Sequence, residues 1–596
     1  MKTKIKLLLT ALVFICCSCD SFLTRDPLDK IENTPEFYNR ESNVRSSIFG
    51  LYDEYFVGYN KGWNRNDWFE GTNVAEWVDD LAQIEATHFT KQAPSTSSRW
   101  GFELVRRINI IIAGVENSEL ANEVKNHWVG VGRFLRAMEY SKLVRTFGDV
   151  PYFDKEVVST DIKTLYKPRD PRSFVMDKVL EDLEFAAEHV RLSDGEKGLA
   201  INRDVVMAYA SRILLFEGTW QKYREADPAL ATTYLEASKK FAENILSSGR
   251  YSISPNYKAL TTSVDLAGNP EIIMYRSYVA GVVTHSQMSY QSEQTRGNAP
   301  SKDLIDSYPS KNGLPIFQSE NTEFQGERDY QAEMADRDPR LYDNIDASSL
   351  RLNGIDPLYG ISGYAGTRFI NESLLGTPDG QSSTNTTDAP LMKLNEVMLN
   401  YIEAAAELAD LGKYTLTQAD FDKTINKIRA RESVQMPALS LAGTELSVGG
   451  VVINDPNRDP SVSPILWEIR RERRIELVFE GIRFDDLRRW NKLAYADMQL
   501  NKKLNLGAWL DKEAFVREYN AAHPDTPITL ADLNKINLDR DGNAGYIKPI
   551  EHKVQMRTYS EKDYLYPIPT QQITLYENKA KELNDSSIKL VQNPGW

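Results

Sequence analysis

Residues 468–490 read EIRRERRIELVFEGIRFDDLRRW, and no other stretch says as much about the architecture of this chain. Glutamates stand at positions 468, 472, 476 and 480, with arginines three and four residues away from them. Side chains at these offsets are neighbours on a helix surface, where opposite charges stabilise the helix. The charge run at residues 468–476, followed by Glu480, therefore predicts a helix laced by ion pairs. A nucleic-acid-binding role for its arginines is disfavoured, because the chain as a whole is acidic.

Working outward from this stretch, most of the chain has helical patterning. Apolar residues recur at helical spacing, and glycine or proline follows the expected helix ends. The predicted helices span residues 134–147, 173–190, 203–217, 234–247, 394–411 and 419–430, with Ser173 as an expected cap. Short polar turns join them in pairs that resemble the helix-turn-helix unit of tetratricopeptide repeats, although the strict repeat period is absent.

The segments between these helices are different in composition. Residues 281–330, 371–390 and 437–464 are rich in Gly, Pro, Ser, Asn and Gln, which is typical of loops, and short strands such as residues 271–275 are expected among them. The sequence thus predicts a mainly α protein. In this fold a tetratricopeptide-like helical-repeat scaffold packs against a loop-rich, irregular half with a few short strands.

Length and composition limit the classes of function. The chain has 596 residues, 41% of them hydrophobic and 26% charged, which is ordinary for a globular protein with a sizeable core. Its net charge of −14 argues against nucleic acid or an anionic membrane surface as the main partner.

The N-terminus has the pattern of an export signal. Lysines among the first six residues precede an apolar stretch, residues 7–15, that is too short to span a bilayer and suits a signal-peptide core. Ser18 supplies the small residue that a cleavage site needs before Cys19. The pattern resembles a bacterial lipoprotein signal, which implies cleavage before Cys19 and a lipid on its sulfur. The alternative is an ordinary signal peptide with incidental cysteines.

Cleavage there fixes the properties of the mature chain. No cysteine follows Cys19, so disulfides, thiolate metal sites and a cysteine nucleophile are excluded. Removing the signal leaves 68 basic and 85 acidic residues, a net charge of −17. We expect a signal peptide over residues 1–18, a lipid-anchored tether over 19–35, an N-terminal helical region over 36–270 and a C-terminal region over 271–596. The last two regions form one globular unit.

Signatures of catalysis and cofactors are scarce. The six histidines show no zinc-ligand spacing, and no phosphate-binding loop or nucleophile elbow is present. The acid pairs Asp79-Asp80 and Asp485-Asp486 are interpreted as solvated or helix-capping residues, because adjacency in sequence does not supply the geometry of a glycosidase. We therefore expect no enzyme activity and no cofactor.

One stretch suggests a cation. Asp539, Asp541 and Asn543 alternate as oxygen ligands do in a calcium loop, but Ala544 stands where glycine is needed and Ile550 where the bidentate glutamate belongs. The alternative is an ordinary Asp/Asn/Gly turn. The stretch remains a calcium candidate without the full motif.

Aromatic residues beside short polar side chains are the remaining candidates. A sugar ring stacks its C–H face on an aromatic ring, while its hydroxyls need paired donors and acceptors. Three groups fit this description: Trp63, Trp68 and Trp77 with Asp67, Asn73 and Asp80; Tyr278 and Tyr290 with Arg296; and Tyr364 with Arg368. The alternative for each aromatic residue is a place in the core.

Several motifs along the chain resemble those of the SusD/RagB outer-membrane lipoproteins of Bacteroidetes. They occur in family order: CDSFLTRDP (19–27), RFLRA (133–137) with FGDVP (147–151), RDPR (337–340), NEVMLNYIEA (395–404), IRAR (428–431), ERRIELVFEGIRFDDLRRW (472–490), YPIP (566–569) and QNPG (592–595). The sequence departs from the family pattern at Asn395, where alanine is usual, and at Lys393, where arginine is usual.

This resemblance implies a helical scaffold of tetratricopeptide-like units and a non-enzymatic protein on the cell exterior. It implies a lid that closes over a TonB-dependent SusC-like porin and captures oligosaccharides or, in some members, peptides. A cell-surface hydrolase is the third alternative. The strongest motifs belong to the scaffold, and ligand-contacting residues vary within the family, so the resemblance transfers none of them.

Overall fold

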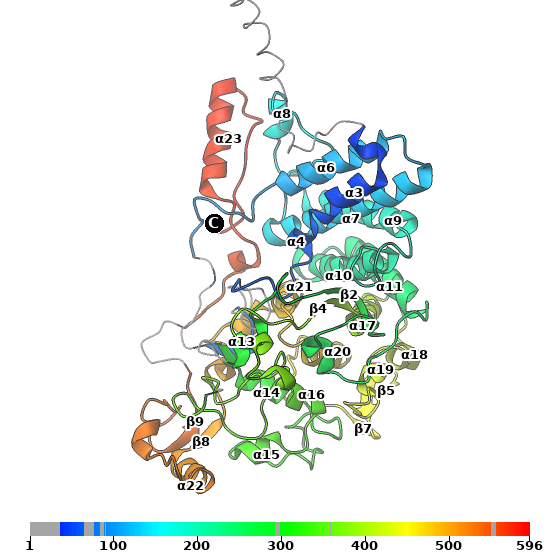
Figure 1. The fold of residues 1–596 in the computed structure, drawn as a ribbon. Helices are drawn as coiled ribbons and strands as arrows, with labels where there is room; N and C mark the ends of the chain where they lie inside the picture. Colours follow the sequence, from blue (N-terminus) through cyan, green and yellow to red (C-terminus); the bar gives the residue numbers. More distant parts are fainter. Residues whose placement is uncertain are drawn as a thin grey trace, which may run out of the picture.

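The computed structural model describes residues 36–64, 77–83, 89, 91–292, 298–357, 359–549 and 556–596. Helices gather at one end of the molecule and irregular segments at the other, with α10, α11, α17 and α20 between them (Figure 1). The longer helices are α3 (Glu41–Phe49), α6 (Glu103–Glu116), α7 (Asn122–Phe147), α9 (Arg172–His189), α10 (Arg203–Trp220), α11 (Pro228–Leu246), α17 (Leu394–Asp410), α20 (Pro464–Glu476), α22 (Lys512–Ala522) and α23 (Thr570–Leu583).

Short elements complete the described part of the chain. The short helices are α4 (Tyr52–Tyr55), α8 (Ile162–Leu165), α12 (Ala259–Thr262), α13 (Gln287–Ser292), α14 (Lys302–Ser307), α15 (Tyr330–Met334), α16 (Pro339–Asn344), α18 (Gln418–Asp422), α19 (Ile425–Arg429) and α21 (Arg483–Arg489). The mainly helical fold predicted from the sequence is confirmed.

Helix α7 shows why sequence periodicity underestimates a buried helix. It ends as predicted at Phe147, where Gly148 adopts a φ of 75°, but it begins at Asn122 rather than near residue 134. Its early turns contain Gly130 and Gly132, which lower helix propensity. A Cβ at Gly130 would lie 2.9 Å from Val190 Cγ2, and one at Gly132 would lie 2.7 Å from Ile112 Cγ1. Close helix packing therefore requires these glycines and outweighs their low propensity.

The other predicted helices are present with small shifts. Helix α9 begins at Arg172, so Ser173 lies inside the first turn and does not cap it. Residues 419–430 form two short helices, α18 and α19, instead of one. The backbone at Thr424 has φ −128° and ψ −99°, and its Oγ1 donates to the carbonyl of Asp420. The helix is interrupted at that residue.

Strands are few and short. Antiparallel pairs join β1 (Leu81–Gln83) to β3 (Asn298–Pro300), β2 (Ile272–Arg276) to β4 (Ala389–Lys393), and β8 (Trp509–Asp511) to β9 (Ala544–Tyr546). A small meander contains β5 (Ser440–Ala442), β6 (Glu445–Val448) and β7 (Val451–Val452). The pair β2–β4 places the segment before residue 276 beside the one that leads into α17. The predicted strand at residues 271–275 is confirmed with a one-residue shift.

Helix α20 carries ion pairs, but most of them join it to other elements. Glu472 accepts from Arg340 at 2.6 Å and from Arg429 at 3.0 Å. Glu476 accepts from Arg340 at 2.9 Å and from Arg431 at 2.6 Å. One pair within the helix is Glu468–Arg471, at 2.8 Å. The helix is thus part of a buried ionic core, because its charged side chains meet opposite charges from α16, α19 and neighbouring segments.

Apolar cores lie on both sides of this ionic layer. The largest cluster of buried apolar side chains draws on the N-terminal helices and on α17 and α20, and includes Val144, Leu214, Leu399 and Ile469. A second large cluster surrounds Trp220. No helix in the described part of the chain is long and apolar enough to cross a membrane.

Candidate ligand-binding surface

An exposed tryptophan stands at the end of a tight turn, residues 57–64. Trp63 is 45% exposed, although it is a large apolar side chain. Gly58 and Gly62 adopt φ values of 56° and 59° in this turn, and a Cβ at Gly58 would lie 2.9 Å from the Cβ of Ala389. The amide of Gly62 donates to the carbonyl of Thr284 at 2.8 Å. The turn is therefore anchored on a second loop and presents Trp63 outward.

That second loop carries Tyr290, which supports the tryptophan. Tyr290 lies on α13, its hydroxyl donates to the carbonyl of Trp63 at 3.2 Å, and the ring centroids are 5.9 Å apart with an interplanar angle of 80°. An edge-to-face contact of this kind fixes the orientation of both rings. Tyr290 is 9% exposed, so it holds Trp63 from below and leaves the indole accessible. We call Trp63, Tyr290 and the loops that carry them the Trp63–Tyr290 surface.

His285 joins this loop to a third one, residues 371–388. Its ring is fully buried, and burial lowers the pKa of His285 to about 3, so the imidazole is neutral at physiological pH. Nδ1 accepts from the amide of Gln287 at 3.0 Å, which leaves Nε2 as the protonated nitrogen that donates to the carbonyl of Thr387 at 2.8 Å. Asn385 pairs with His285 through both backbone groups. The neutral histidine thus ties two loops that lie about a hundred residues apart in sequence.

Tyr278 and Arg276 hold the turn from behind. The hydroxyl of Tyr278 donates to the carbonyl of Asn60 at 2.7 Å, and the amide of Tyr278 donates to Asp388 at 2.9 Å. The Arg276 guanidinium donates to the carbonyl of Val57 at 3.0 Å. Tyr278 is 3% exposed, so it positions the surface and does not touch a ligand in this conformation.

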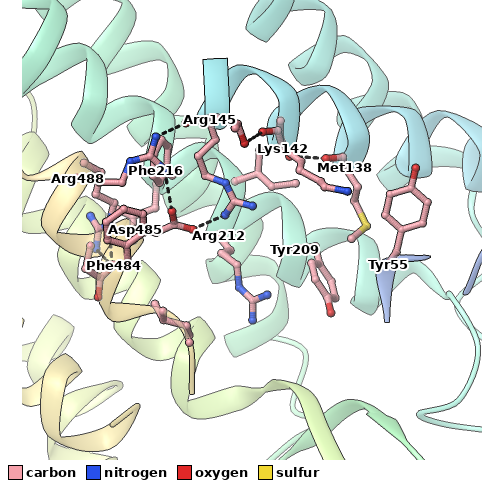
Figure 2. A pocket seen from close by; sticks show the side chains of 18 of the residues that line it. Tyr55, Met138, Lys142, Arg145, Tyr209, Arg212, Phe216, Phe484, Asp485 and Arg488 are labelled. Carbon is pink, nitrogen blue, oxygen red and sulfur yellow. Dashed lines mark hydrogen bonds and ion pairs between the residues drawn. The ribbon is translucent and has the colours of Figure 1, made fainter. Parts of the chain in front are cut away.

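A cavity of about 570 Å³ opens beside the same turn, between α7, α10 and α21 (Figure 2). Val57, Gly58 and Asn60 form part of its wall. Several of its charged side chains are paired: Arg145 donates to Asp485 at 2.5 Å, and Arg212 makes two hydrogen bonds to Glu396, at 2.5 and 2.6 Å. The cavity lies next to the Trp63–Tyr290 surface, because the turn at residues 57–60 lines both.

The structure corrects the expectation for two members of the first aromatic group. Trp77 is 4% exposed and packs on Phe89 and Phe484, with ring centroids 5.0 and 5.7 Å away. Asp80 is 3% exposed and accepts from Arg474 at 2.7 Å. Both residues belong to the interior and are not available to a sugar. Trp77 is thus a core anchor, although it lies only 14 residues after the exposed Trp63 in the sequence.

Three of the four paired acids, Asp79, Asp80 and Asp486, are buried, whereas the sequence predicted solvated or helix-capping residues. Asp485 is partly exposed. Asp79 is 1% exposed and makes two hydrogen bonds to Arg483, at 2.7 and 2.8 Å. Burial alone raises a carboxyl pKa, but Arg474 and Arg483 hold the pKa of Asp79 below its usual range. Asp486 is also buried, and it accepts from Arg473 at 2.9 Å. These carboxylates neutralise buried arginines.

The third group, Tyr364 and Arg368, is buried as well. Tyr364 is fully buried, and its hydroxyl donates to the Glu333 carboxylate at 2.9 Å. Arg368 is 1% exposed and forms an ion pair with Glu480. Their polar ends are engaged by other buried residues, so the predicted ligand contact is wrong for this conformation.

The calcium candidate does not form a cation site. The Asp539 carboxylate is held by Arg540 at 2.8 and 3.0 Å and accepts from the amide of Tyr546. Asn543 donates to Glu513 at 3.0 Å. Among the described residues, no group of acids and histidines is arranged to hold a metal ion. The stretch is the Asp/Asn/Gly turn that leads into β9.

Several predicted residues lie outside the described residues: Trp68, Asp67, Asn73 and Arg296, together with Cys19 and the signal region. Their roles stay predictions.

The sequence did not indicate that His285 and Asn385 support the Trp63–Tyr290 surface. Their pairing joins distant loops, and no periodicity or short spacing indicates it.

Comparison with known proteins places this geometry in a family. The model of the SusD family, SusD_RagB, matches residues 356–596. This match and the SusD-like relatives support the SusD/RagB family for the chain. SusD-like protein P38 of Formosa agariphila is 22% identical over 80% of this chain and 88% of its own length. SusD-like protein P25 of the same organism is 28% identical over 35% of this chain, a match that spans 42% of P25.

Solved SusD-like structures share the fold. A SusD-like carbohydrate-binding protein from Bacteroides fragilis superposes with a TM-score of 0.65 at 20% identity, over 90% of this chain and 99% of that one. A laminarin-binding SusD-like protein gives a TM-score of 0.53 at 17% identity, over 94% of this chain and all of that one. At these identities the likeness establishes the fold, and what those proteins bind is a property of those proteins.

Proposed function

We propose that the protein is a cell-surface glycan-binding lipoprotein that captures oligosaccharides and delivers them to a TonB-dependent SusC-like outer-membrane transporter. The observation that carries the proposal is the exposed indole of Trp63, held edge-on by Tyr290 on loops that His285 fixes. A rigid, exposed aromatic face suits stacking on a sugar ring. The match to the family and the carbohydrate-binding relative of similar fold support the same ligand class.

The anchoring part of the proposal rests on the N-terminal sequence. Cys19 carries the lipid, and residues 19–35 tether the globular unit to the outer membrane, facing the cell exterior. A diacyl group and an N-acyl chain would together satisfy the two-signal requirement for stable anchoring. The role is one of binding, with no catalytic step and no cofactor assigned.

Affinity gel electrophoresis of the soluble chain, residues 20–596, against a polysaccharide panel tests the ligand class. We expect one glycan to retard the protein and a peptide digest not to compete. The Trp63→Ala variant should lose at least about fivefold in affinity, because an aromatic contact of this kind contributes about 1–3 kcal/mol. Phe174→Ala is the matched control, since Phe174 is 42% exposed and its ring contacts Tyr152 and Lys178, which are not part of this surface.

The other outcomes separate the alternatives. Retardation by a glycan that is unchanged in Trp63→Ala would move the site away from this surface. Competition by the peptide digest, with no retardation by any glycan, would favour a peptide ligand on the same scaffold. Release of shorter sugars during incubation would indicate a hydrolase.

A further inference from the structure

A second cavity, of about 460 Å³, lies on a different side of the ionic core. The loop at residues 455–460, helix α20, helix α14 and the 3-10 segments at 493–496 and 502–505 enclose it. None of its lining residues belongs to the Trp63–Tyr290 surface. Its volume falls within the range of pockets that bury small ligands.

Aromatic side chains in this cavity are fixed by hydrogen bonds at their polar ends. Trp467 is half-buried, and its Nε1 donates to Asp455 at 2.8 Å. Tyr495 is half-buried, and its hydroxyl donates to Asp459 at 2.6 Å. Leu500, which also lines the cavity, is 65% exposed and lies at its opening. The ring faces are therefore oriented before any ligand arrives, which lowers the entropy cost of binding.

Most charged groups in the wall already neutralise one another, and Arg458 instead donates to the backbone carbonyl of Val462 at 2.6 Å. Asp455 accepts from Arg471 at 2.5 Å, and Asp459 accepts from Lys492 at 2.7 Å. In the same way Asp306 pairs with Lys503 at 2.7 Å and Asp303 with Arg474 at 2.9 Å. The paired carboxylates retain lone pairs for further donors, and a cationic ligand would have to displace the arginine or lysine already paired with each of them.

One buried donor in the wall lacks an acceptor. Arg470 lines the cavity and is 5% exposed, and its Nε has no hydrogen-bond partner among the described residues. A buried N–H without an acceptor is destabilising, and a ligand hydroxyl or a water can supply the missing hydrogen bond. The side-chain amide of the exposed Asn457 adds both a donor and an acceptor.

We propose that this cavity is a second binding site, which takes a neutral sugar ring stacked on Trp467 with its hydroxyls on Asp455, Asp459 and Asn457. Flat apolar faces combined with neutralised donors and acceptors match a polyol better than they match a carboxylate, a phosphate or an amine. The inference goes beyond the proposed function, because it places a saccharide contact on residues that the Trp63–Tyr290 surface does not share.

Saturation-transfer NMR on the mature chain tests this site. The probes are glucose, galactose, mannose, xylose and the disaccharides maltose, cellobiose and lactose, with glucuronate and galacturonate as charged counterparts. We expect signal from at least one neutral sugar in the wild type and in Trp63→Ala. That signal should fall at least fivefold in Trp467→Ala and in Leu500→Arg. Leu500→Arg changes an exposed side chain, so it obstructs the opening without unfolding the protein.

The remaining outcomes overturn the inference. Absence of signal from every neutral sugar, or a signal that both cavity variants leave intact, would contradict a sugar site here. A signal from the uronates alone, lost in the cavity variants, would contradict the neutral class. A signal lost in Trp63→Ala and kept in both cavity variants would leave the proposed function standing and remove the second site.

Discussion

The ionic core around α20 and the Trp63–Tyr290 surface are built in opposite ways. In the core, Glu476 accepts from Arg340, Arg431 and Asn395, all buried, at 2.9, 2.6 and 2.8 Å. At the surface, loops are joined by backbone bridges and a neutral histidine, and the presented side chain is exposed. Buried charges require particular partners, whereas backbone bridges accept almost any side chain. The core therefore fixes residue identity and leaves a recognisable motif, and the surface does not.

The largest expected loss of folding stability comes from removing a charged side chain from the ionic core. Replacing Glu476 with alanine leaves Arg340 and Arg431 without one of their buried carboxylates, and loss of one member of a buried charge network costs about 3–5 kcal/mol. We expect the midpoint of chemical denaturation to fall sharply or the variant to fail to fold. Glu582→Ala is the control, since its pair with Lys579 is on the surface and should contribute about 0.5 kcal/mol or less. Equal stabilities for the two variants would contradict the distinction between core and surface.

An intermediate loss of folding stability is expected at low pH, because His285 joins two loops as a neutral side chain. His285 in the folded state binds a proton only near pH 3, whereas in the unfolded chain it does so near its ordinary pKa of 6.5. The unfolded state therefore binds more protons between these values, and stability falls as the pH falls. At pH 4.5 this group alone should cost about 2–3 kcal/mol relative to pH 7.5.

Denaturation midpoints of the wild type and His285→Gln, measured at pH 7.5 and pH 4.5, isolate this contribution. The variant should be less stable at pH 7.5 and lose less on acidification. His127 stays titratable in both proteins; burial lowers its pKa to about 4. An identical loss of stability in wild type and variant would show that His285 does not carry the effect.

The smallest expected effect is a loss of glycan affinity when Tyr278 no longer holds the turn at residues 57–64. Tyr278→Phe removes the hydroxyl that donates to the carbonyl of Asn60, a contribution of about 1 kcal/mol. Glycan affinity should fall by roughly fivefold while the fold is retained. Tyr342→Phe removes a hydroxyl elsewhere in the molecule that donates to the carbonyl of Met334 and accepts from the amide of Arg337, and it should leave glycan affinity unchanged. Calorimetric titration with the glycan that retards the wild type measures the affinity of both variants. Equal glycan affinities for Tyr278→Phe and Tyr342→Phe would show that the turn does not contribute to binding.

The same contrast explains how much the sequence could predict. The family motifs and the helical periodicity predict both ends of α10 and α17 within three residues and the end of α11 within one, whereas α11 begins six residues before its predicted start. The departures from the family pattern also have partners here, because Asn395 donates to Glu476 and Lys393 pairs with Glu480. These positions can be predicted because packing and buried charge constrain them.

The ligand-binding residues were predicted less accurately than the helices, because the local sequence composition does not distinguish an exposed aromatic side chain from a buried one. Trp63 and Trp77 stand in similar polar contexts, yet their exposed fractions are 45% and 4%. Exposure depends on where the backbone turns, and the turn at Trp63 is anchored by contacts with loops more than two hundred residues away. No local pattern carries that information.

The most direct measurement is a crystal structure of the soluble chain with the glycan that retards it. We predict a sugar ring packed against the exposed face of Trp63, with the tyrosine at position 290 still edge-on beneath it. A glycan bound elsewhere, with the indole of Trp63 in contact with solvent alone, would contradict the assignment of this surface as the capture site.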